Sequence, residues 1–189
     1  MTYDLTMTVD RGDRVEDDFM TADEAAGLIT RLELAINRVS QSLERWTVEL
    51  HHMVGNRAMG VNDVNVLHAV RMLSGAPDIG ALARFLNRFD HANIQYSLKK
   101  LEEYEFIERI SDKPSRKTLY RTTAEGLTVS DRFSHFRRHI LVSELEKQEE
   151  WITCIPEISK KLDDLRVVLE QKTQLIVDRN VLGDDQVKV

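Results

Sequence analysis

The sequence is poor in cysteine and in the residues that interrupt helices. Its 189 residues include three prolines, eight glycines and only 6% aromatic residues, which disfavours a turn-dense sandwich or barrel and predicts a mostly helical chain. The single cysteine, Cys154, excludes an internal disulfide and a thiolate metal cage and fits a reducing compartment. There is neither a signal-peptide pattern nor an apolar run of the ~18 residues that span a bilayer. We therefore expect a cytoplasmic protein.

Charge is distributed unevenly along the chain. The net charge of −6 argues at first against nucleic-acid binding, because phosphate contacts need lysine and arginine. Residues 1–20 carry six acidic and two basic side chains with few large apolar residues, which predicts a flexible acidic tail. Between Ala81 and Thr122, however, nine basic residues oppose six acidic ones. A basic segment inside an acidic protein is typical of a module that contacts phosphate.

Helical periodicity and capping residues define the first half of the chain. Residues 21–55 hold apolar side chains at alternating spacings of three and four, which predicts one long helix with a heptad seam. Asp78 and Asp90 are expected to be the N-caps of two short helices joined by a turn at 87–89, which together make a helix-turn-helix. The seam residues are Ile29, Leu32, Ile36, Val39, Leu43, Trp46, Leu50 and Met53.

A hairpin and further helices are expected after the helix-turn-helix. The runs 106–110 and 118–122 are rich in β-branched and aromatic residues and flank a basic loop, so they predict a β-hairpin. Thr122 and Glu125 match a capping box, which places the start of a helix there. A second heptad stripe, 155–169, predicts a final amphipathic helix. Pro156 marks either its first turn or a kink.

The helix that follows Asp90 presents a small polar face. At about 100° per residue, Ile94 and Leu98 fall on one side and Gln95 and Tyr96 on the other. A helix in the major groove needs hydrogen-bonding side chains near its N-terminal half, and long cations in a hairpin loop reach the minor groove or the DNA backbone. The predicted DNA-binding residues are His91, Asn93, Gln95, Tyr96, Lys99, Lys100, Lys113, Arg116 and Lys117.

The order of these elements resembles the winged-helix regulators of the MarR family. The run NIQYSLKKLEEYEFI at 93–107 is similar to that family's recognition helix leading into its wing, and 116–126 is similar to the return strand and the next helix start. Arg116 falls where the main wing arginine is expected. Departures from the family pattern are Pro114, Ser115 and the Gln95-Tyr96 pair, so the operator sequence cannot be carried over.

The resemblance implies a mainly α fold with a small β-wing, organised as a winged helix-turn-helix with long dimerisation helices at both ends. The expected parts are an N-terminal dimerisation helix at 21–55, the DNA-binding domain at 61–123 and C-terminal dimerisation helices at 124–178. It also implies a homodimer that binds a palindromic operator in double-stranded DNA and regulates transcription, most often as a repressor. From the apolar pattern alone, closure of both stripes within one chain stays open.

A small-molecule effector between the dimer helices and the DNA-reading lobe is also implied by the resemblance. Trp46, His51, Met53 and Met72 are candidates to border that pocket, although ordinary core packing is favoured for each of them.

Other chemistry is not favoured by the sequence. A metal site at His51, His52 and His68 is disfavoured because adjacent histidines diverge on a helix. Redox sensing at Cys154 is disfavoured because its apolar neighbours raise a thiol pKa. There is no Gly-rich phosphate loop and no nucleophile elbow, so neither an enzyme nor a cofactor is expected. The alternative function is a dimeric winged-helix adaptor that contacts proteins without specific DNA binding.

Overall fold

The structure is a computed structural model that describes residues 20, 22–55, 58–112 and 117–182. The predicted acidic tail at 1–20 lies outside these residues except for Met20, and so does the tip of the predicted hairpin loop. The chain divides into two compact units, Met1–Leu127 and Thr128–Val189. In the part of the chain that is described, no helix is both long enough and apolar enough to cross a membrane.

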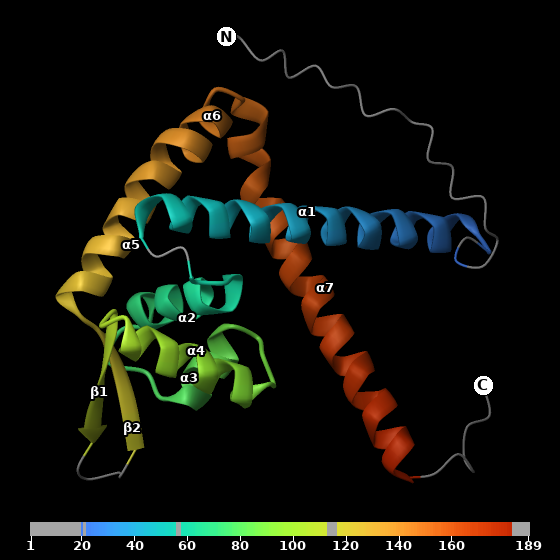
Figure 1. Cartoon of the computed structure of the whole chain (residues 1–189). Helices are drawn as coiled ribbons and strands as arrows, with labels where there is room; N and C mark the ends of the chain where they lie inside the picture. Colours follow the sequence, from blue (N-terminus) through green and yellow to red (C-terminus); the bar gives the residue numbers. More distant parts are fainter. Residues whose placement is uncertain (1–19, 21, 56–57, 113–116, 183–189) are drawn as a thin grey trace. The chain divides into compact units, whose positions relative to one another are not determined.

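The first unit is the predicted helix-turn-helix and hairpin, preceded by a long helix (Figure 1). Its centre is α2, which packs against α1 and α4, while the hairpin lies against α2 and α4. The strands pair antiparallel with Ile107 opposite Thr122. The elements are α1 (Glu24–Val54), α2 (Val61–Met72), α3 (Ile79–Phe85), α4 (His91–Glu103), β1 (Ile107–Asp112) and β2 (Lys117–Thr122).

The core of this unit surrounds α2. Val64 and Leu67 of α2 are fully buried, as are Leu82 of α3 and Ile94 of α4. On α3 and α4 the buried residues follow the helical period, so burial of one stripe orients each of these helices. In contrast, α2 is buried or half-buried on all sides from Val61 to Arg71. The remaining large core residues are Leu50, Val54, Met59, Val66, Val70, Leu98, Leu101, Phe106, Ile107 and Tyr120.

Both predicted aspartate caps are confirmed. The Asp78 carboxylate accepts a hydrogen bond from the Ala81 N–H at 2.8 Å, and the Asp90 carboxylate accepts one from the Asn93 N–H at 3.1 Å. Each satisfies a backbone donor that the first helical turn leaves without a partner. The two short helices therefore begin where the sequence predicts.

Both short helices end without glycine. Asn87 follows α3 with φ 51° and Glu105 follows α4 with φ 58°, in the left-handed region that usually favours glycine. After each, the chain closes a Schellman motif: the Arg88 N–H donates to the Ala83 carbonyl at 2.8 Å, and the Phe106 N–H to the Leu101 carbonyl at 2.9 Å. These two turns separate α3 from α4 and α4 from β1.

The second unit is helical in its described residues.

The helix after the hairpin begins in the first unit and is capped by Thr123, whose hydroxyl accepts a hydrogen bond from the Gly126 N–H at 3.1 Å. The predicted cap at Thr122 is therefore wrong. Thr122 is instead the last residue of β2, because strand pairing extends to it. The helices are α5 (Ala124–Arg137), which crosses the unit boundary, η2 (Arg138–Val142, a π-helix), α6 (Ser143–Glu146) and α7 (Glu149–Leu182).

Pro156 lies inside α7, so of its two predicted positions the first turn is wrong. The helix begins at Glu149, seven residues earlier, and continues to Leu182. Proline in a helix interior removes one backbone donor and crowds the preceding turn.

A tight approach at Gly126 generates the first prediction. A Cβ at this position would lie 2.0 Å from the carbonyl oxygen of Phe106 and 2.8 Å from Cγ2 of Thr122. We expect Gly126→Ala to lower the free energy of unfolding by about 3 kcal/mol, because the backbone must move to admit the methyl group. Denaturant unfolding of the full chain measures this change.

The matched control is Gly80→Ala in α3, where the nearest atom to a Cβ is 3.4 Å away. This variant should unfold at the same denaturant concentration as the parent or slightly higher, because alanine favours helices over glycine. Equal stability of the two variants would show that α5 does not approach Phe106 this closely.

Candidate nucleic-acid interface

Helix α4 has the two faces that the sequence predicts. Ile94 and Leu98 are buried, whereas Gln95, Tyr96 and Lys99 are exposed. Tyr96 is 67% exposed, and Lys99 makes only a long, exposed ion pair of 4.0 Å with Glu103. The outer face therefore carries an amide, a phenol and an ammonium group that are available to hydrogen-bond to a ligand.

The polar residues near the N-terminal end of α4 fall into two groups, one exposed and one hydrogen-bonded to the protein. His91 is exposed, whereas the side-chain amide of Asn93 donates to the Asp90 carboxylate that caps the helix. Arg88, in the preceding turn, donates to the Asn62 side chain of α2 at 2.7 Å. Asn93 and Arg88 therefore fix the turn, and His91 faces solvent.

Lys100 is turned toward the protein rather than outward. Its ammonium donates to the Asp63 carboxylate at 2.7 Å and to the Ala58 carbonyl at 2.6 Å. The other oxygen of Asp63 accepts from the Ser97 hydroxyl at 2.7 Å, and the Gly60 N–H donates to this side chain at 2.9 Å. This cluster joins the start of α2 to the inner edge of α4. Lys100 is therefore removed from the set of residues that we propose to contact DNA.

The charge of Asp63 is maintained although the residue is only 4% exposed. Burial by itself raises the pKa of Asp63, but the hydrogen bonds from Lys100, Gly60 and Ser97, with the Lys100 charge, outweigh burial and lower it. The same hydrogen bond raises the pKa of Lys100. The two groups thus form an ion pair at neutral pH.

The hairpin is attached to α3 by a backbone bond and an ion pair. The Tyr120 N–H donates to the Pro77 carbonyl at 3.0 Å, and the Lys117 ammonium lies 3.2 Å from the Asp78 carboxylate. Hydrogen bonds from the Ala81 N–H and Lys117 lower the pKa of Asp78. Two of the predicted wing contacts, Lys113 and Arg116, lie outside the described residues.

Further basic residues of this segment are paired with carboxylates. Arg109 lies 2.6 Å from Glu102, and Arg121 lies 2.6 Å from Glu108. With Lys100 and Lys117, four of the basic residues that make the segment positive are engaged by acidic side chains. The excess of basic residues in the sequence therefore overstates the positive field at this surface.

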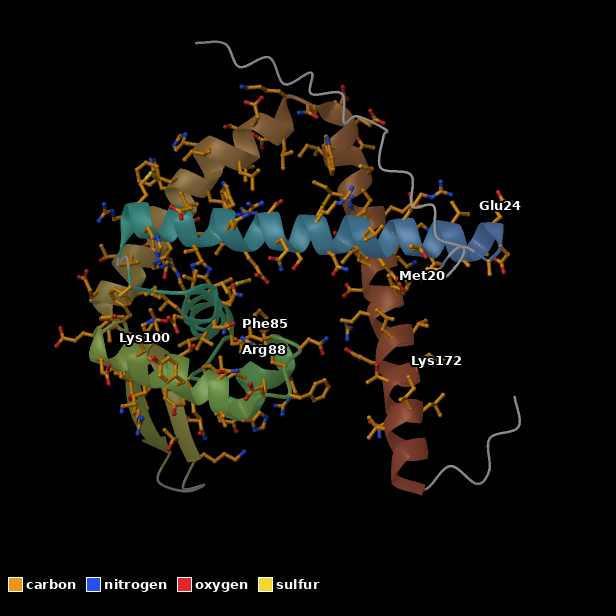
Figure 2. The ribbon with its side chains drawn as sticks, turned by 45° about the vertical axis from the view of Figure 1, so that its right-hand side comes forward. Met20, Glu24, Phe85, Arg88, Lys100 and Lys172 are labelled. Carbon is orange, nitrogen blue, oxygen red and sulfur yellow. The ribbon has the colours of Figure 1, made fainter. Side chains whose placement is uncertain are left out.

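Phe89 is an exposed residue beside α4 that the sequence analysis missed. It is 90% exposed in the turn just before the helix, and its carbonyl accepts from the His91 N–H at 3.1 Å. Figure 2 shows Phe85 and Arg88 at one end of the α3–α4 pair and Lys100 at the other. The sequence feature that could have identified Phe89 is an aromatic residue that lies outside the apolar stripes of both α3 and α4.

The four candidate effector residues have different environments. His51 is fully buried, whereas Met53 is 50% and Met72 is 70% exposed; Trp46 is half-buried. Burial, and then the charge of nearby His52, lowers the pKa of His51 to about 4, so this imidazole is neutral near pH 7. A hollow of about 240 Å³ beside α1 is instead lined by Glu44, Arg45, Val48, Glu49 and Val61.

Known proteins match this chain in fold. Residues 59–126 match the family described as winged helix DNA-binding domain. A cysteine mutant of MarR from E. coli complexed with operator DNA aligns with a TM-score of 0.60 at 18% identity, over 74% of this chain and 99% of that one. FabT from Streptococcus pneumoniae in complex with DNA aligns with a TM-score of 0.57 at 16% identity, over 76% of this chain and 98% of that one.

A MarR/EmrR family transcriptional regulator from Acinetobacter sp. ADP1 aligns with a TM-score of 0.53 at 17% identity, over 80% of this chain and 99% of that one. No match was found among curated proteins. The predicted fold class, a mainly helical winged helix-turn-helix with a small β-wing, is confirmed by these alignments.

The Asp63 cluster generates the second prediction. Lys100→Met removes the ammonium and leaves the buried carboxylate of Asp63 without its cation, so we expect the free energy of unfolding to fall by about 2 kcal/mol. Denaturant unfolding at neutral pH measures the loss.

Lys99→Met is the matched control, because it makes the same chemical change one residue earlier on the exposed face. We expect it to change stability by less than about 0.5 kcal/mol. If the two variants are equally stable, the Asp63 cluster does not hold α4 in place.

Proposed function

We propose that this protein is a transcriptional regulator of the MarR type that binds double-stranded DNA as a homodimer. The observation that carries the proposal is α4, which buries one face on the lobe and presents Gln95, Tyr96 and Lys99 on the other. A helix of this kind, followed by a hairpin, is suited to the major groove. The E. coli MarR and S. pneumoniae FabT structures that share the fold are complexes with DNA.

In this proposal the α4 face reads base edges and the hairpin grips the backbone or the minor groove. Gln95 suits adenine, while Tyr96 and Lys99 contact bases or phosphate. Lys113 and Arg116 belong to the loop between the strands, and Lys117 begins β2. The pair between Lys117 and Asp78 is exposed and worth little, so a DNA phosphate replaces Asp78 at low cost.

Exposed apolar stripes on α1 and α7 support a homodimer. On α1 the heptad positions Ile29, Leu32, Val39 and Leu43 are all at least two-fifths exposed, with Val39 at 65%. Stripes of this length open to water mark protein-contact surfaces. A two-fold dimer places two recognition helices about 34 Å apart on one face of DNA, which predicts a palindromic operator. The exposed positions of the predicted stripe at 155–169, on α7, are Ile155, Ile158, Leu162 and Leu169.

Regulation is expected to be repression by occupation of a promoter, with a small-molecule effector that changes the spacing of the recognition helices. No catalytic activity is assigned, and the expected place of action is the cytoplasm. Tight operator binding that no screened small molecule alters would remove the effector from this proposal without affecting DNA binding.

A dimeric adaptor that contacts proteins is the second candidate function. It is favoured by the pairing of Lys100, Arg109, Lys117 and Arg121 with carboxylates, which reduces the field available to phosphate. The two functions differ in salt dependence, because phosphate binding weakens steeply as salt rises.

Selection of genomic DNA fragments by the purified protein at ~0.15 M salt, followed by sequencing, tests the proposed function. Enrichment of one palindrome supports it. Recovery of no sequence by a folded dimer would favour the adaptor.

Gln95 and Arg116 are expected to have different roles on the enriched duplex. Gln95→Ala should lower discrimination against single base changes at one position by about 1–3 kcal/mol. Arg116→Ala should weaken binding to all duplexes and reduce the slope of log affinity against log salt by about one. Fluorescence anisotropy over a salt series measures both. If both variants bind every duplex as the parent does, the assignment of recognition helix and wing is wrong.

Phe89 is expected to contact a thymine methyl group, the apolar feature of the major groove. Replacing thymine by deoxyuridine throughout the enriched duplex should weaken the parent by about fourfold for each contacted methyl, at about 0.8 kcal/mol per buried carbon. Phe89→Ala should bind both duplexes equally. Equal loss in Phe89→Ala and the parent would place the methyl contact elsewhere.

A further inference from the structure

Two histidines lie on successive helical turns where α5 meets η2. His135 and His139 are four residues apart and both are exposed. Their ring centroids are 4.4 Å apart with an interplanar angle of 62°. The sequence analysis considered metal binding only at His51, His52 and His68, and this spacing was missed.

The ring nitrogens of the pair are available. The two rings contact each other, and the His135 ring also contacts Phe136. Within the described part of the chain no hydrogen bond occupies either ring. Neutral imidazole has one nitrogen lone pair that can bind a metal. Two such lone pairs on neighbouring turns can converge on one ion.

The rings are in T-shaped contact, and their separation allows chelation once the two exposed side chains rotate to turn a nitrogen of each toward one ion. With metal–nitrogen bonds of about 2.0 Å, an ion lies about 3.2 Å from each ring centroid, so centroids about 4.5 Å apart correspond to a ligand–metal–ligand angle near 90°. The observed 4.4 Å is close to this value. A right angle is the geometry of square-planar and octahedral sites, which Cu²⁺ and Ni²⁺ prefer.

The local backbone is unusual at this point. His139 is the second residue of the π-helix Arg138–Val142, and the Ser143 hydroxyl donates to its carbonyl at 2.5 Å. Single π-helical turns are rare and are often found at functional sites. The π-helix is thus a second observation, independent of the ring geometry, at the same place.

The charges around the pair are mixed. The carboxylate of Glu146 lies 2.7 Å from the Arg138 guanidinium and compensates the cation next to His139. The other charged residues between positions 131 and 139 are Asp131, Arg132 and Arg137. Because imidazole binds a metal ion through a nitrogen lone pair, binding depends on the two rings rather than on a negative field.

We propose that His135 and His139 form a two-nitrogen binding site for a divalent transition-metal ion of the class that prefers imidazole, Cu²⁺ or Ni²⁺. Among the described residues no cluster of three or more His, Cys, Asp or Glu side chains is placed to hold a metal, so water completes the coordination. The bound ion links the last turn of α5 to η2. This site does not depend on the proposed DNA binding.

Titration calorimetry of the tag-free, chelator-treated full chain with NiCl₂ and CuCl₂ at pH 7.5 tests the site. We expect one ion per chain. His135→Gln and His139→Gln should each weaken binding by about tenfold or more, because a single imidazole cannot chelate.

His91→Gln, which removes an exposed histidine of α4, is the matched control and should bind as the parent does. The electron paramagnetic resonance spectrum of bound Cu²⁺ should show two nitrogen ligands in the parent and fewer in either single variant. In metal-free buffer all variants should unfold at the same temperature, because the substituted side chains are exposed. Equal affinity of the parent and both pair variants for Ni²⁺ would overturn the proposal.

Discussion

The carboxylate of Asp63 holds α2 to α4, the helix whose outer face carries Gln95, Tyr96 and Lys99. It accepts hydrogen bonds from the Gly60 N–H, the Ser97 hydroxyl and the Lys100 ammonium, all between 2.7 and 2.9 Å. Because Ser97 and Lys100 both lie on the inner side of α4, these bonds fix the rotation of that helix about its axis. The exposure of Gln95, Tyr96 and Lys99 follows from this constraint together with burial of the Ile94 stripe.

The same cluster shows how an acidic protein can carry a basic module. Several cations of the segment 81–122 are paired with carboxylates of the same unit: Lys100 with Asp63, Lys117 with Asp78 and Arg109 with Glu102. In the proposed function, interaction with phosphate then depends on fewer residues than the composition indicates. A surface with a modest field and an amide, a phenol and an exposed phenylalanine is better suited to selective contacts than to strong non-specific attraction.

The tight turns on either side of α4 form at residues other than glycine. Asn87 and Glu105 take left-handed backbone conformations, and Schellman hydrogen bonds stabilise both ends, so the chain reverses tightly before α4 and enters β1 directly after it. At Gly126, by contrast, glycine is required because α5 passes against the Phe106 carbonyl. The positions of α4 and the hairpin therefore depend on a few local hydrogen bonds and one close backbone approach.

The sequence by itself determined the features that depend on near neighbours. The heptad period of α1, the caps at Asp78 and Asp90 and the two faces of α4 involve residues within a turn or two of each other, so they could be read without coordinates. Only the tertiary structure decided which partner the charged end of a long side chain binds. Lys100 binds Asp63, 37 residues away, and Lys117 pairs with Asp78. It also moved the α5 cap to Thr123, because strand pairing includes Thr122. Side-chain partners distant in sequence follow from packing, which no local pattern records.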